Sequence, residues 1–301
     1  MPLPTIVIPC FNSAKFISQT LESSLSLSLG IDKPQIIAID DGSTDETAKI
    51  IQRYPVRMVS QKNAGDSAAR NTGLGLTETE FIIFLDHDDI LEPTSIIHHI
   101  TGFRQHPDAV MILGSNFLID QSGNRCGINM LKPGRFSSRD VVMGTTPSFS
   151  QCMYRTADLK AAGGFRPEAG SCADHDINLR LLGQNREGYI HGEVVMSYRL
   201  HAAQQTKSPC KLFSKHMEIL EEHLRAGGTI DNPVLLEKAR KHWAFYYGQF
   251  FPGEFYRAVV HGRVSVALSI LKASVMYFPH SIKGAAWHIT KRLRKSSIRK
   301  S

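Results

Sequence analysis

The sequence predicts an α/β protein in which helices flank a mostly parallel sheet, with a helical extension at the C-terminal end. Strand-like and helix-like segments alternate four times in the first hundred residues, a pattern typical of doubly wound sheets. Two of the strand-like segments end abruptly on aspartates. Because open α/β sheets bind ligands beyond the carboxyl ends of their strands, these aspartates are candidates for a binding site.

The first predicted strand covers residues 5–9 and leads into the turn Cys10-Phe11-Asn12. Apolar residues recur at helical spacing just beyond this turn, which predicts an amphipathic helix. The apolar side of that helix carries Phe16, Ile17, Leu21 and Leu25. The first strand and helix therefore form one unit of the alternating pattern.

The second predicted strand, residues 35–39, closes on Asp40 and Asp41, and a glycine turn follows. Ser43 and Glu46 stand at the spacing of a capping box, so a helix is expected from there through about Tyr54. A purely structural role at this helix-capping turn is the alternative interpretation of the two aspartates.

The third predicted strand, 56–60, runs through Asn63-Ala64-Gly65 into a helix that carries Arg70 and Asn71. The fourth, 81–85, stops on Asp86-His87-Asp88-Asp89. Burying such carboxylates without a positive partner costs several kcal/mol per ion. Two aspartates one residue apart can instead bind a hard cation such as Mg²⁺ or Mn²⁺, which commonly bridges carboxylates to phosphate. A solvated turn rich in aspartate is the alternative.

Taken in order, these segments resemble the family 2 glycosyltransferases, which are inverting enzymes with the GT-A fold. The resemblance rests on motifs at the family's spacing: Pro9-Cys10-Phe11-Asn12, Asp40-Asp41-Gly42-Ser43-Thr44-Asp45, Asn63-Ala64-Gly65 with Ala69-Arg70-Asn71, Asp86-His87-Asp88-Asp89, Gly163-Gly164-Phe165, Asp174-His175-Asp176-Ile177-Asn178-Leu179-Arg180 and Tyr198-Arg199-Leu200-His201. It covers roughly residues 3–207. It implies a GT-A catalytic domain over residues 1–207, followed by a helical C-terminal region with a basic tail over 208–301.

The resemblance implies a nucleotide-diphosphate sugar as donor, with UDP the expected nucleotide. The residues that match the family's donor site are Pro9, Phe11, Asn12, Asp40, Asp41, Asn63, Arg70, Asp86 and His87. In the family the first aspartate pair holds the base, and the position of Asp86 lies near the ribose and the metal. Carboxylates suit this task because they accept hydrogen bonds from a pyrimidine imide N–H and from ribose hydroxyls.

The resemblance also implies a divalent cation, Mn²⁺ or Mg²⁺, with Asp88 as its main ligand. Such a cation acts as a Lewis acid and neutralises charge as the diphosphate leaves. His201 follows a predicted strand at 194–200 and matches a position that meets either the metal or the diphosphate. A neutral imidazole can ligate Mn²⁺ and a protonated one can pair with phosphate, so both roles stay open. Arg70 and Arg199 could support carboxylates or phosphates of the site, and they could equally form structural ion pairs.

Asp174 is the candidate catalytic base. In the family, the second member of an acidic pair at the start of a helix deprotonates the acceptor hydroxyl, and residues 176–181 predict that helix. The helix dipole favours the ionised carboxylate there, so burial and bound substrate must set the pKa of the base. The residue before Asp174 is Ala173, where the family usually has an acid. A helix-capping aspartate without a catalytic role is the alternative.

The composition is that of a chain able to bury one large core plus an appendage, with 301 residues of which 42% are hydrophobic. Its five cysteines, at positions 10, 126, 152, 172 and 210, are odd in number and lack metal-site spacing. They indicate free thiols in a reducing cytosol. Met1-Pro2-Leu3-Pro4 runs directly into the first strand without a signal-peptide pattern, so a cytoplasmic protein is expected.

The net charge of +7 is concentrated near the end of the sequence. Residues 283–300 hold seven lysines and arginines and no acid, and an apolar segment, 264–278, precedes them. Nucleic-acid-binding domains more often spread basic residues over a folded face, so no nucleic-acid partner is expected. Peripheral contact with anionic lipid at the cytoplasmic face of the inner membrane is one interpretation. A core helix followed by a disordered tail is the other, and the segment, interrupted by Lys272, is too short to predict a membrane span.

Family motifs end near residue 207, and the rest is predicted to be mostly helical. Helices are expected over 212–225, 233–250 and 255–277. Breaks between them are expected at Gly227-Gly228 and at Pro252-Gly253. Between residues 108 and 144, a strand, a turn at 121–124 and a polar connection are expected. This part varies with the acceptor in the family, so it indicates no substrate.

These residues bear on four candidate functions. The favoured one is an inverting glycosyltransferase of cell-envelope polysaccharide biosynthesis, with a polysaccharide, lipid-linked or lipopolysaccharide acceptor. A sugar-1-phosphate nucleotidyltransferase would need a glycine-rich signature after Ile8, and a Rossmann oxidoreductase would need Gly-x-Gly-x-x-Gly there. The chain has Pro9-Cys10-Phe11-Asn12 instead. A non-catalytic sugar-nucleotide-binding protein is suggested by Ala173, whereas Asp88 and Asp174 together favour the enzyme.

Overall fold

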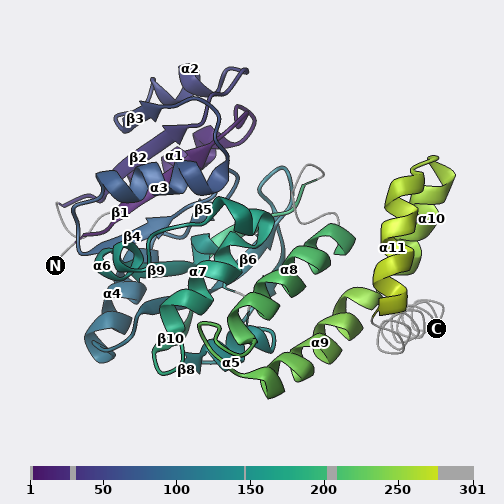
Figure 1. Cartoon of the computed structure of the whole chain (residues 1–301). Coiled ribbons are helices and arrows are strands. Elements are labelled where there is room, and N and C mark those ends of the chain that lie inside the picture. Colours follow the sequence, from purple (N-terminus) through teal and green to yellow (C-terminus); the bar gives the residue numbers. More distant parts are fainter. Residues whose placement is uncertain (1–2, 28–31, 146, 202–208, 277–301) are drawn as a thin grey trace, which may run out of the picture. The chain divides into compact units, whose positions relative to one another are not determined.

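The computed structural model describes residues 3–27, 32–145, 147–201 and 209–276. The chain divides into two compact units, Met1–Ala202 and Ala203–Ser301. The first unit is built around a sheet with helices on its faces, and the second is helical in its described part (Figure 1). The α/β fold with helices flanking a sheet, followed by helices at the C-terminal end, is therefore confirmed.

In the described part of the first unit, ten strands form one mixed sheet. Along the sheet the main order is β3-β2-β1-β4-β9-β6-β10-β5, while β7 pairs with β6 and β8 with β10. The strands are β1 Thr5–Cys10, β2 Gln35–Asp40, β3 Arg57–Ser60, β4 Phe81–Phe84, β5 Ile90–Leu91, β6 Met111–Ile119, β7 Arg125–Asn129, β8 Gly134–Ser137, β9 Cys152–Arg155 and β10 Glu187–Arg199.

The first four strands form the parallel half of the sheet. β1 pairs in parallel with β2 on one side and with β4 on the other, and β2 continues in parallel to β3. β2 and β3 thus lie on one side of β1 and β4 lies on the other. The strand order therefore reverses between β1 and β4, which makes this position a topological switch point. In open α/β sheets the ligand crevice forms at such a point, beyond the carboxyl ends of the strands.

The remaining strands are mixed in direction. β9 runs antiparallel to both β4 and β6, which it joins. β6 and β10 pair in parallel over a long register. β5 and β8 run antiparallel to β10, and β7 runs antiparallel to β6. The sequence predicted a mostly parallel sheet, and each antiparallel pair involves a short strand that the sequence did not predict, namely β5, β7, β8 or β9.

Seven α-helices lie in the described residues of the first unit, together with two 3₁₀ segments, Phe149–Gln151 and Pro167–Cys172. Their bounds are α1 Ile17–Ser26, α2 Thr47–Ile51, α3 Asp66–Leu76, α4 Ser95–Gln105, α5 Ser138–Val142, α6 Thr156–Ala161 and α7 Ala173–Leu182.

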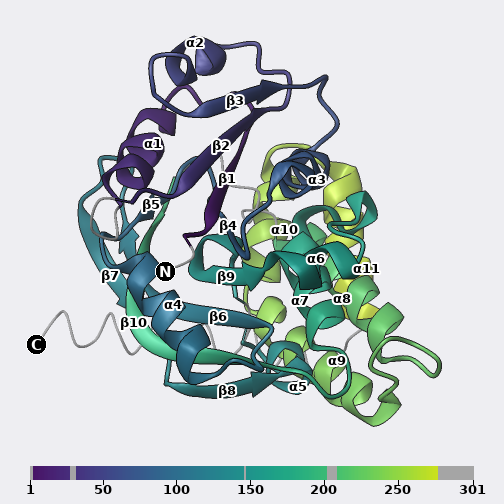
Figure 2. The ribbon, with the colours of Figure 1, turned by 90° about the vertical axis from the view of Figure 1, so that its left-hand side faces the viewer.

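Helices α1 and α3 cover opposite faces of β1 (Figure 2). Successive strand residues point to opposite faces, so Ile6 and Ile8 face one way and Val7 the other. The isoleucines belong to the same buried cluster as Ile17 of α1. On the other face, a Cβ added at Gly73 of α3 would lie 2.2 Å from a Val7 methyl carbon, so only glycine permits this close approach.

The helix after β2 starts later than predicted. α2 covers Thr47–Ile51, and the Thr47 N–H donates to Asp45 Oδ1 at 2.9 Å. The Ser43 hydroxyl instead accepts the Asn12 N–H at 3.0 Å. The predicted capping box at Ser43 and Glu46 is therefore wrong, because a long-range bond engages the Ser43 hydroxyl.

The second unit, in its described residues, consists of α8 Pro209–Leu224, α9 Pro233–Gly248, α10 Phe251–Val260 and α11 Val264–Met276. The predicted break at Pro252-Gly253 and the single helix over 255–277 are both wrong. Pro252 lies in the first turn of α10, where its missing N–H costs nothing. The break after α9 lies instead at residues 249–250, and a second break at residues 261–263, where Gly262 has a φ of 65°, divides the helix predicted over 255–277.

No helix in the described residues has the length and apolar character required to cross a bilayer. The predicted apolar segment 264–278 is seen as α11 up to Met276, and the basic segment 283–300 lies outside the described residues. Cys10, Cys126, Cys152 and Cys172 form no disulfide, and the side chain of Cys210 lies outside the described set.

Candidate active site

The aspartate motif begins at the switch point of the sheet. After β4, the Leu85 N–H donates to the Val7 carbonyl at 2.9 Å, and the chain then turns at Asp86-His87-Asp88-Asp89. Phe11 and Asn12 follow β1, the neighbouring strand. The carboxyl ends of β1 and β4 therefore bring the first and fourth predicted motifs to the same edge.

Asn12 joins the loop after β1 to the loop after β2. Its backbone has a φ of 49°, and its Oδ1 accepts the Thr44 N–H at 2.8 Å. These bonds engage Asn12 within the protein. Phe11 beside it is 45% exposed, so its ring is accessible to a ligand. Pro9 is a buried residue of β1, paired with Ile39.

Asp40 and Asp41 are both buried and already hydrogen-bonded. Asp40 Oδ1 accepts the Ser43 N–H at 3.1 Å. The Asp41 carboxylate accepts hydrogen bonds from three donors of the loop between β3 and α3: Gln61 Nε2 at 2.7 Å, Ala64 N–H at 3.0 Å and Gly65 N–H at 2.8 Å. Asp41 therefore organises that loop, on which the exposed Asn63 lies.

Gly42 allows the loops after β2 and β3 to approach each other. Its φ of 74° favours glycine, and a Cβ at this position would lie 2.9 Å from the Asn63 backbone nitrogen. The Asp-Asp-Gly motif thus has a structural reason in this chain in addition to any contact with a ligand.

Arg70 is buried beneath the aspartate motif. Its Nη2 lies 2.6 Å from Asp86 Oδ1 and its Nη1 lies 2.9 Å from Asp66 Oδ2. The guanidinium also lies 4.2 Å from the centre of the Phe149 ring, a cation–π contact. Burial raises the pKa of Asp86. The Arg70 charge lowers this pKa, and the Asp66 and Asp88 carboxylates raise it further. Arg70 is thus ion-paired both within its own helix and to the aspartate motif, an arrangement that fits both roles the sequence left open.

Asp88 and His201 come together from opposite halves of the first unit. His201 Nε2 lies 2.7 Å from Asp88 Oδ2, and both side chains are mostly buried. The Phe16 ring lies beside the imidazole, with centroids 5.0 Å apart. His87 is only partly buried in the same motif. The predicted metal residues therefore form a carboxylate–imidazole pair at the carboxyl ends of β4 and β10.

Arg199 holds the aspartate loop in place from below. Its side chain is 0% exposed, and its Nε donates to the Asp88 carbonyl at 2.7 Å. Its backbone N–H donates to Asp89 Oδ1 at 3.1 Å, and its Nη2 to Gln19 Oε1 at 2.6 Å. These contacts assign Arg199 to supporting the loop, a role for which its fully buried guanidinium is suited.

Thr20 supports the site and was not singled out from sequence, whereas Asp89 was named as part of the aspartate motif without a role of its own. The Thr20 hydroxyl lies 2.8 Å from the carbonyl oxygens of both His87 and Asp89. Asp89 Oδ2 is buried without a hydrogen-bond partner among the described residues, and burial raises the pKa of this carboxyl. The available signal for Thr20 was a polar residue next to Leu21 on the apolar side of a predicted helix.

Asp174 lies in the first turn of α7 and is partly buried. Burial raises the pKa of Asp174 to about 6, while the His175 N–H, which donates to Asp174 Oδ1 at 2.7 Å, lowers it. The Arg70 charge also lowers this pKa and the Asp86 charge raises it, so Asp174 shares one region with the Arg70–Asp86 pair. A carboxylate with such a pKa can accept a proton near neutral pH.

Asp176, two residues later, has a different environment. It is fully buried and forms ion pairs with Arg166 and with Arg180, whose Nη2 lies 2.8 Å from Asp176 Oδ2. Arg180 also donates to the carbonyls of Ala162 and Gly164 at 2.6 and 2.7 Å. Asp176 and Arg180 therefore attach α7 to the turn before it.

The Gly-Gly-Phe turn is fixed by Asn71 of α3. Asn71 Nδ2 donates to the Phe165 carbonyl at 2.7 Å, and Asn71 Oδ1 accepts the Phe165 N–H at 2.8 Å. A Cβ on Gly164 would lie 2.4 Å from that Oδ1. The Phe165 ring packs edge-on against Phe84 and Phe149, at 4.8 and 5.2 Å between centroids. This turn is therefore a packing element under the site.

Asp88 and His201 are the residues that could hold a divalent cation, and such a cation would need further ligands. Within the described residues, no group of three or more His, Cys, Asp or Glu side chains is arranged to hold a metal ion. Asp88 and His201 supply one carboxylate and one imidazole, and Asp86 is engaged by Arg70. Mg²⁺ and Mn²⁺ commonly complete their ligand shells with phosphate oxygens and water, so two protein ligands suffice.

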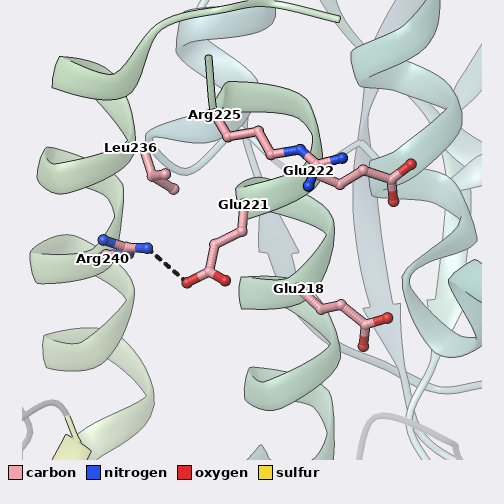
Figure 3. Close-up of a pocket in the computed structure, with 6 residues that line it drawn as sticks. All are labelled: Glu218, Glu221, Glu222, Arg225, Leu236 and Arg240. Carbon is pink, nitrogen blue, oxygen red and sulfur yellow. Dashed lines mark hydrogen bonds and ion pairs between the residues drawn. The ribbon is translucent and has the colours of Figure 1, made fainter. Parts of the chain in front are cut away.

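A separate hollow of about 460 Å³ lies on the helical unit, between α8 and α9 (Figure 3). Its lining residues are Glu218, Glu221, Glu222, Arg225, Leu236 and Arg240. Arg240 Nη2 lies 2.9 Å from Glu221 Oε1, an exposed ion pair of the kind that contributes little to stability. None of the residues predicted for donor, metal or base lines this hollow.

Residues 5–156 match the family model described as glycosyl transferase family 2. The chain is 31% identical over 186 residues to the chondroitin synthase of Escherichia coli, a match that covers 60% of this chain and 26% of that protein. It is 27% identical over 144 residues to the poly(ribitol-phosphate) beta-N-acetylglucosaminyltransferase TarP of Staphylococcus aureus, covering 46% and 43%. The chain spans about a quarter of the length of the first two curated relatives it matches.

Solved structures of similar fold include S. aureus TarS 1-349 in complex with UDP-GlcNAc. The TM-score is 0.65 at 17% sequence identity, and the match covers 93% of this chain and 81% of that one. The same fragment without that ligand gives a TM-score of 0.64 and covers 94% and 81%. At this identity the likeness bears on the fold, and it agrees with the GT-A architecture expected from the motifs.

Proposed function

The chain belongs to glycosyl transferase family 2, and on that premise we propose that it moves a sugar from a UDP-linked donor to an acceptor hydroxyl with inversion. The acceptor class is a glycan, a lipid-linked sugar or a lipopolysaccharide of the cell envelope. The observation that carries the proposal is that the Asp88–His201 pair and the Arg70–Asp86 ion pair share the aspartate motif after β4, while Asp174 is near enough to Arg70 and Asp86 for their charges to shift its pKa.

The donor nucleotide would bind along the carboxyl ends of β1, β2 and β4. The exposed Phe11 ring offers a face for the base, and stacking of a base on an aromatic side chain is favourable. Asp40 and Asp41 would accept hydrogen bonds from the base, with Asn12 and Asn63 on the adjoining loops. Because Asp41 already accepts three hydrogen bonds, Asp40 has the greater remaining capacity for a ligand.

Asp88 and His201 would hold the divalent cation, Mn²⁺ or Mg²⁺, which when bound neutralises charge on the departing diphosphate. Arg199 and Thr20 position this pair by fixing the aspartate loop. Asp86, oriented by Arg70, would lie next to the ribose.

Asp174 would remove the proton from the acceptor hydroxyl. Its raised pKa supports this role, since a base titrating near 6 is largely ionised at neutral pH yet basic enough to accept a proton. One base and a single displacement opposite the leaving group give an inverted product. The fully buried Asp176, paired with two arginines, is suited to structure instead.

The basic segment 283–300 would hold the protein at the cytoplasmic face of a membrane, where lipid-linked acceptors are presented. Its seven lysines and arginines, without an acid among them, suit an anionic surface.

A screen of nucleotide sugars for release of the nucleoside diphosphate tests the proposal directly. UDP should appear with at least one UDP-sugar in Mn²⁺ or Mg²⁺ and should be suppressed by EDTA. Binding of UDP-sugars without any release, with acceptor extracts present, would favour the alternative of a non-catalytic sugar-nucleotide-binding protein.

A further inference from the structure

The helical hairpin formed by α10 and α11 turns apolar side chains to solvent. Six residues, here called the outer stripe, are between 47% and 70% exposed: Tyr256, Val259, Val260, Val264, Leu268 and Leu271. A surface helix normally carries polar residues on the side opposite its core. The outer stripe reverses that pattern on both helices.

On α10 the stripe lies away from the residues that form the core. Phe251, Glu254 and Ala258 are buried and lie on one side of the helix. Side chains two positions apart on a helix point in nearly opposite directions, because each residue advances about 100°. Tyr256 and Val260, each two positions from Ala258, therefore point away from that core.

On α11 the apolar residues recur at helical spacing. Val264, Leu268 and Leu271 stand at positions i, i+4 and i+7, while Ala267 and Ile270 are buried. The Arg263 N–H donates to the Ala258 carbonyl at 2.8 Å and closes the turn between the two helices. The hairpin is thus a defined element and its exposed apolar residues are not a frayed end.

The charges near the outer stripe distinguish between two partners that could cover it, a second copy of this chain and a lipid surface. Arg257 and Arg263 are exposed near the stripe, whereas the acid of α10, Glu254, is buried. Farther along the sequence, residues 283–300 add seven basic residues and no acid. A second copy of this chain would bring like charges together, which disfavours association. Anionic headgroups complement both sets of cations, and apolar residues flanked by cations are typical of helices that lie in a lipid interface.

We propose that the α10–α11 hairpin binds the surface of an anionic lipid bilayer, with the outer stripe entering the boundary between headgroups and acyl chains. This proposal extends the membrane contact proposed for the basic segment, because the hairpin and the basic segment would contribute to binding in different ways. The basic segment supplies attraction that salt weakens, and the outer stripe supplies binding that salt does not weaken.

The test uses the full chain and sedimentation with vesicles of phosphatidylcholine and phosphatidylglycerol, at low and at high salt. In the triple variant Tyr256→Ser, Val260→Ser, Leu268→Ser, the partition coefficient at high salt should fall at least about tenfold, since three large apolar side chains are lost. A matched control, Met130→Ser with Val234→Ser, removes side chains that are 62% and 70% exposed outside the hairpin. The control should bind as the parent does.

Equal binding of the triple variant and the parent at high salt would overturn the inference, as would no salt-resistant binding by the parent. A parent that is dimeric in sedimentation equilibrium and a triple variant that is monomeric, with neither bound to vesicles, would assign the stripe to a second copy. Release of UDP is measured on the same proteins. If no UDP is released while membrane binding still depends on the outer stripe, the catalytic proposal is wrong and the membrane inference stands.

Discussion

His201 Nε2 lies 2.7 Å from Asp88 Oδ2, although 113 positions separate the two residues in the chain. The contact exists because β10, after which His201 follows, lies in the same sheet as β4, after which Asp88 follows. The loop that carries Asp88 is in turn held by Arg199, two residues before His201. The end of β10 therefore supplies both the histidine of the candidate metal pair and the arginine that holds the loop of Asp88.

Asp88→Asn should reduce turnover roughly 10²-fold or more, because a neutral amide is a weaker ligand for the divalent cation that would neutralise charge on the departing diphosphate. Steady-state UDP release over a range of Mn²⁺ concentrations should also show a higher metal requirement. Asp108→Asn is the matched control, since Asp108 is an exposed carboxylate paired with Arg135 on the surface. Full activity of Asp88→Asn, or of the parent protein in EDTA, would contradict the assignment.

Asp176→Asn should destabilise the fold by about 3 kcal/mol, because it leaves two arginines beside a buried neutral amide. Denaturant unfolding of Asp176→Asn and Asp174→Asn separates the two aspartates. Asp174 is only partly buried and forms no such ion pair with any residue that the structure describes, so its variant should unfold close to the parent protein. A large loss of stability in Asp174→Asn and none in Asp176→Asn would reverse the proposed roles.

The buried His99 should make stability depend on pH. Neither of its ring nitrogens has a hydrogen-bond partner among the described residues, and its ring lies 5.2 Å from that of His191. Burial lowers the pKa of His99 well below 6.5, and that of His191 to about 4. Below pH 6.5 the unfolded chain therefore binds protons that the folded chain does not, so the free energy of unfolding falls as pH falls, by up to about 1.4 kcal/mol per pH unit for one group.

In His99→Leu the decline in unfolding free energy between pH 6.5 and 4.5 should be shallower than in the parent. Denaturation curves at several pH values measure it, with the exposed His261→Gln as control. Parallel curves for His99→Leu and the parent would show that another group governs the acid dependence.

Removal of residues 283–301 should release much of the protein from anionic vesicles at low salt, because seven basic residues are lost. UDP release without acceptor should change little, since the donor motifs all precede residue 202. Sedimentation with vesicles at low and moderate salt measures the effect. Equal sedimentation of the full and shortened chains would identify the tail as a solvated end.

Local pattern was sufficient to predict where the strands of the parallel half end and which carboxylates follow them. Apolar runs that stop on Asp40 and Asp86 are visible in sequence, and the family resemblance they carry is confirmed. The antiparallel strands were missed because short, mixed segments such as β8 and β9 lack a period that distinguishes them from loops.

What the side chains do could not be predicted where a partner lies far away in sequence. Ser43 fits a helix cap by its spacing, yet it accepts a hydrogen bond from Asn12, 31 residues earlier. Asp41 resembles a ligand-binding carboxylate, yet Gln61, Ala64 and Gly65 already donate to it. Both cases depend on which loops the sheet brings together, and spacing along the chain does not contain that information.

The most direct test of the central claim is Asp174→Asn, assayed for UDP binding and for sugar transfer on the same preparation. The substitution keeps the shape of the side chain but cannot take a proton, so transfer should fall by roughly 10² to 10⁴ while UDP affinity is kept. In the parent, transfer should rise with pH through about 6, the pKa to which burial raises Asp174, because only the ionised base is active. Retained transfer, or a collapse of UDP affinity in its place, would contradict Asp174 as the base that serves the acceptor.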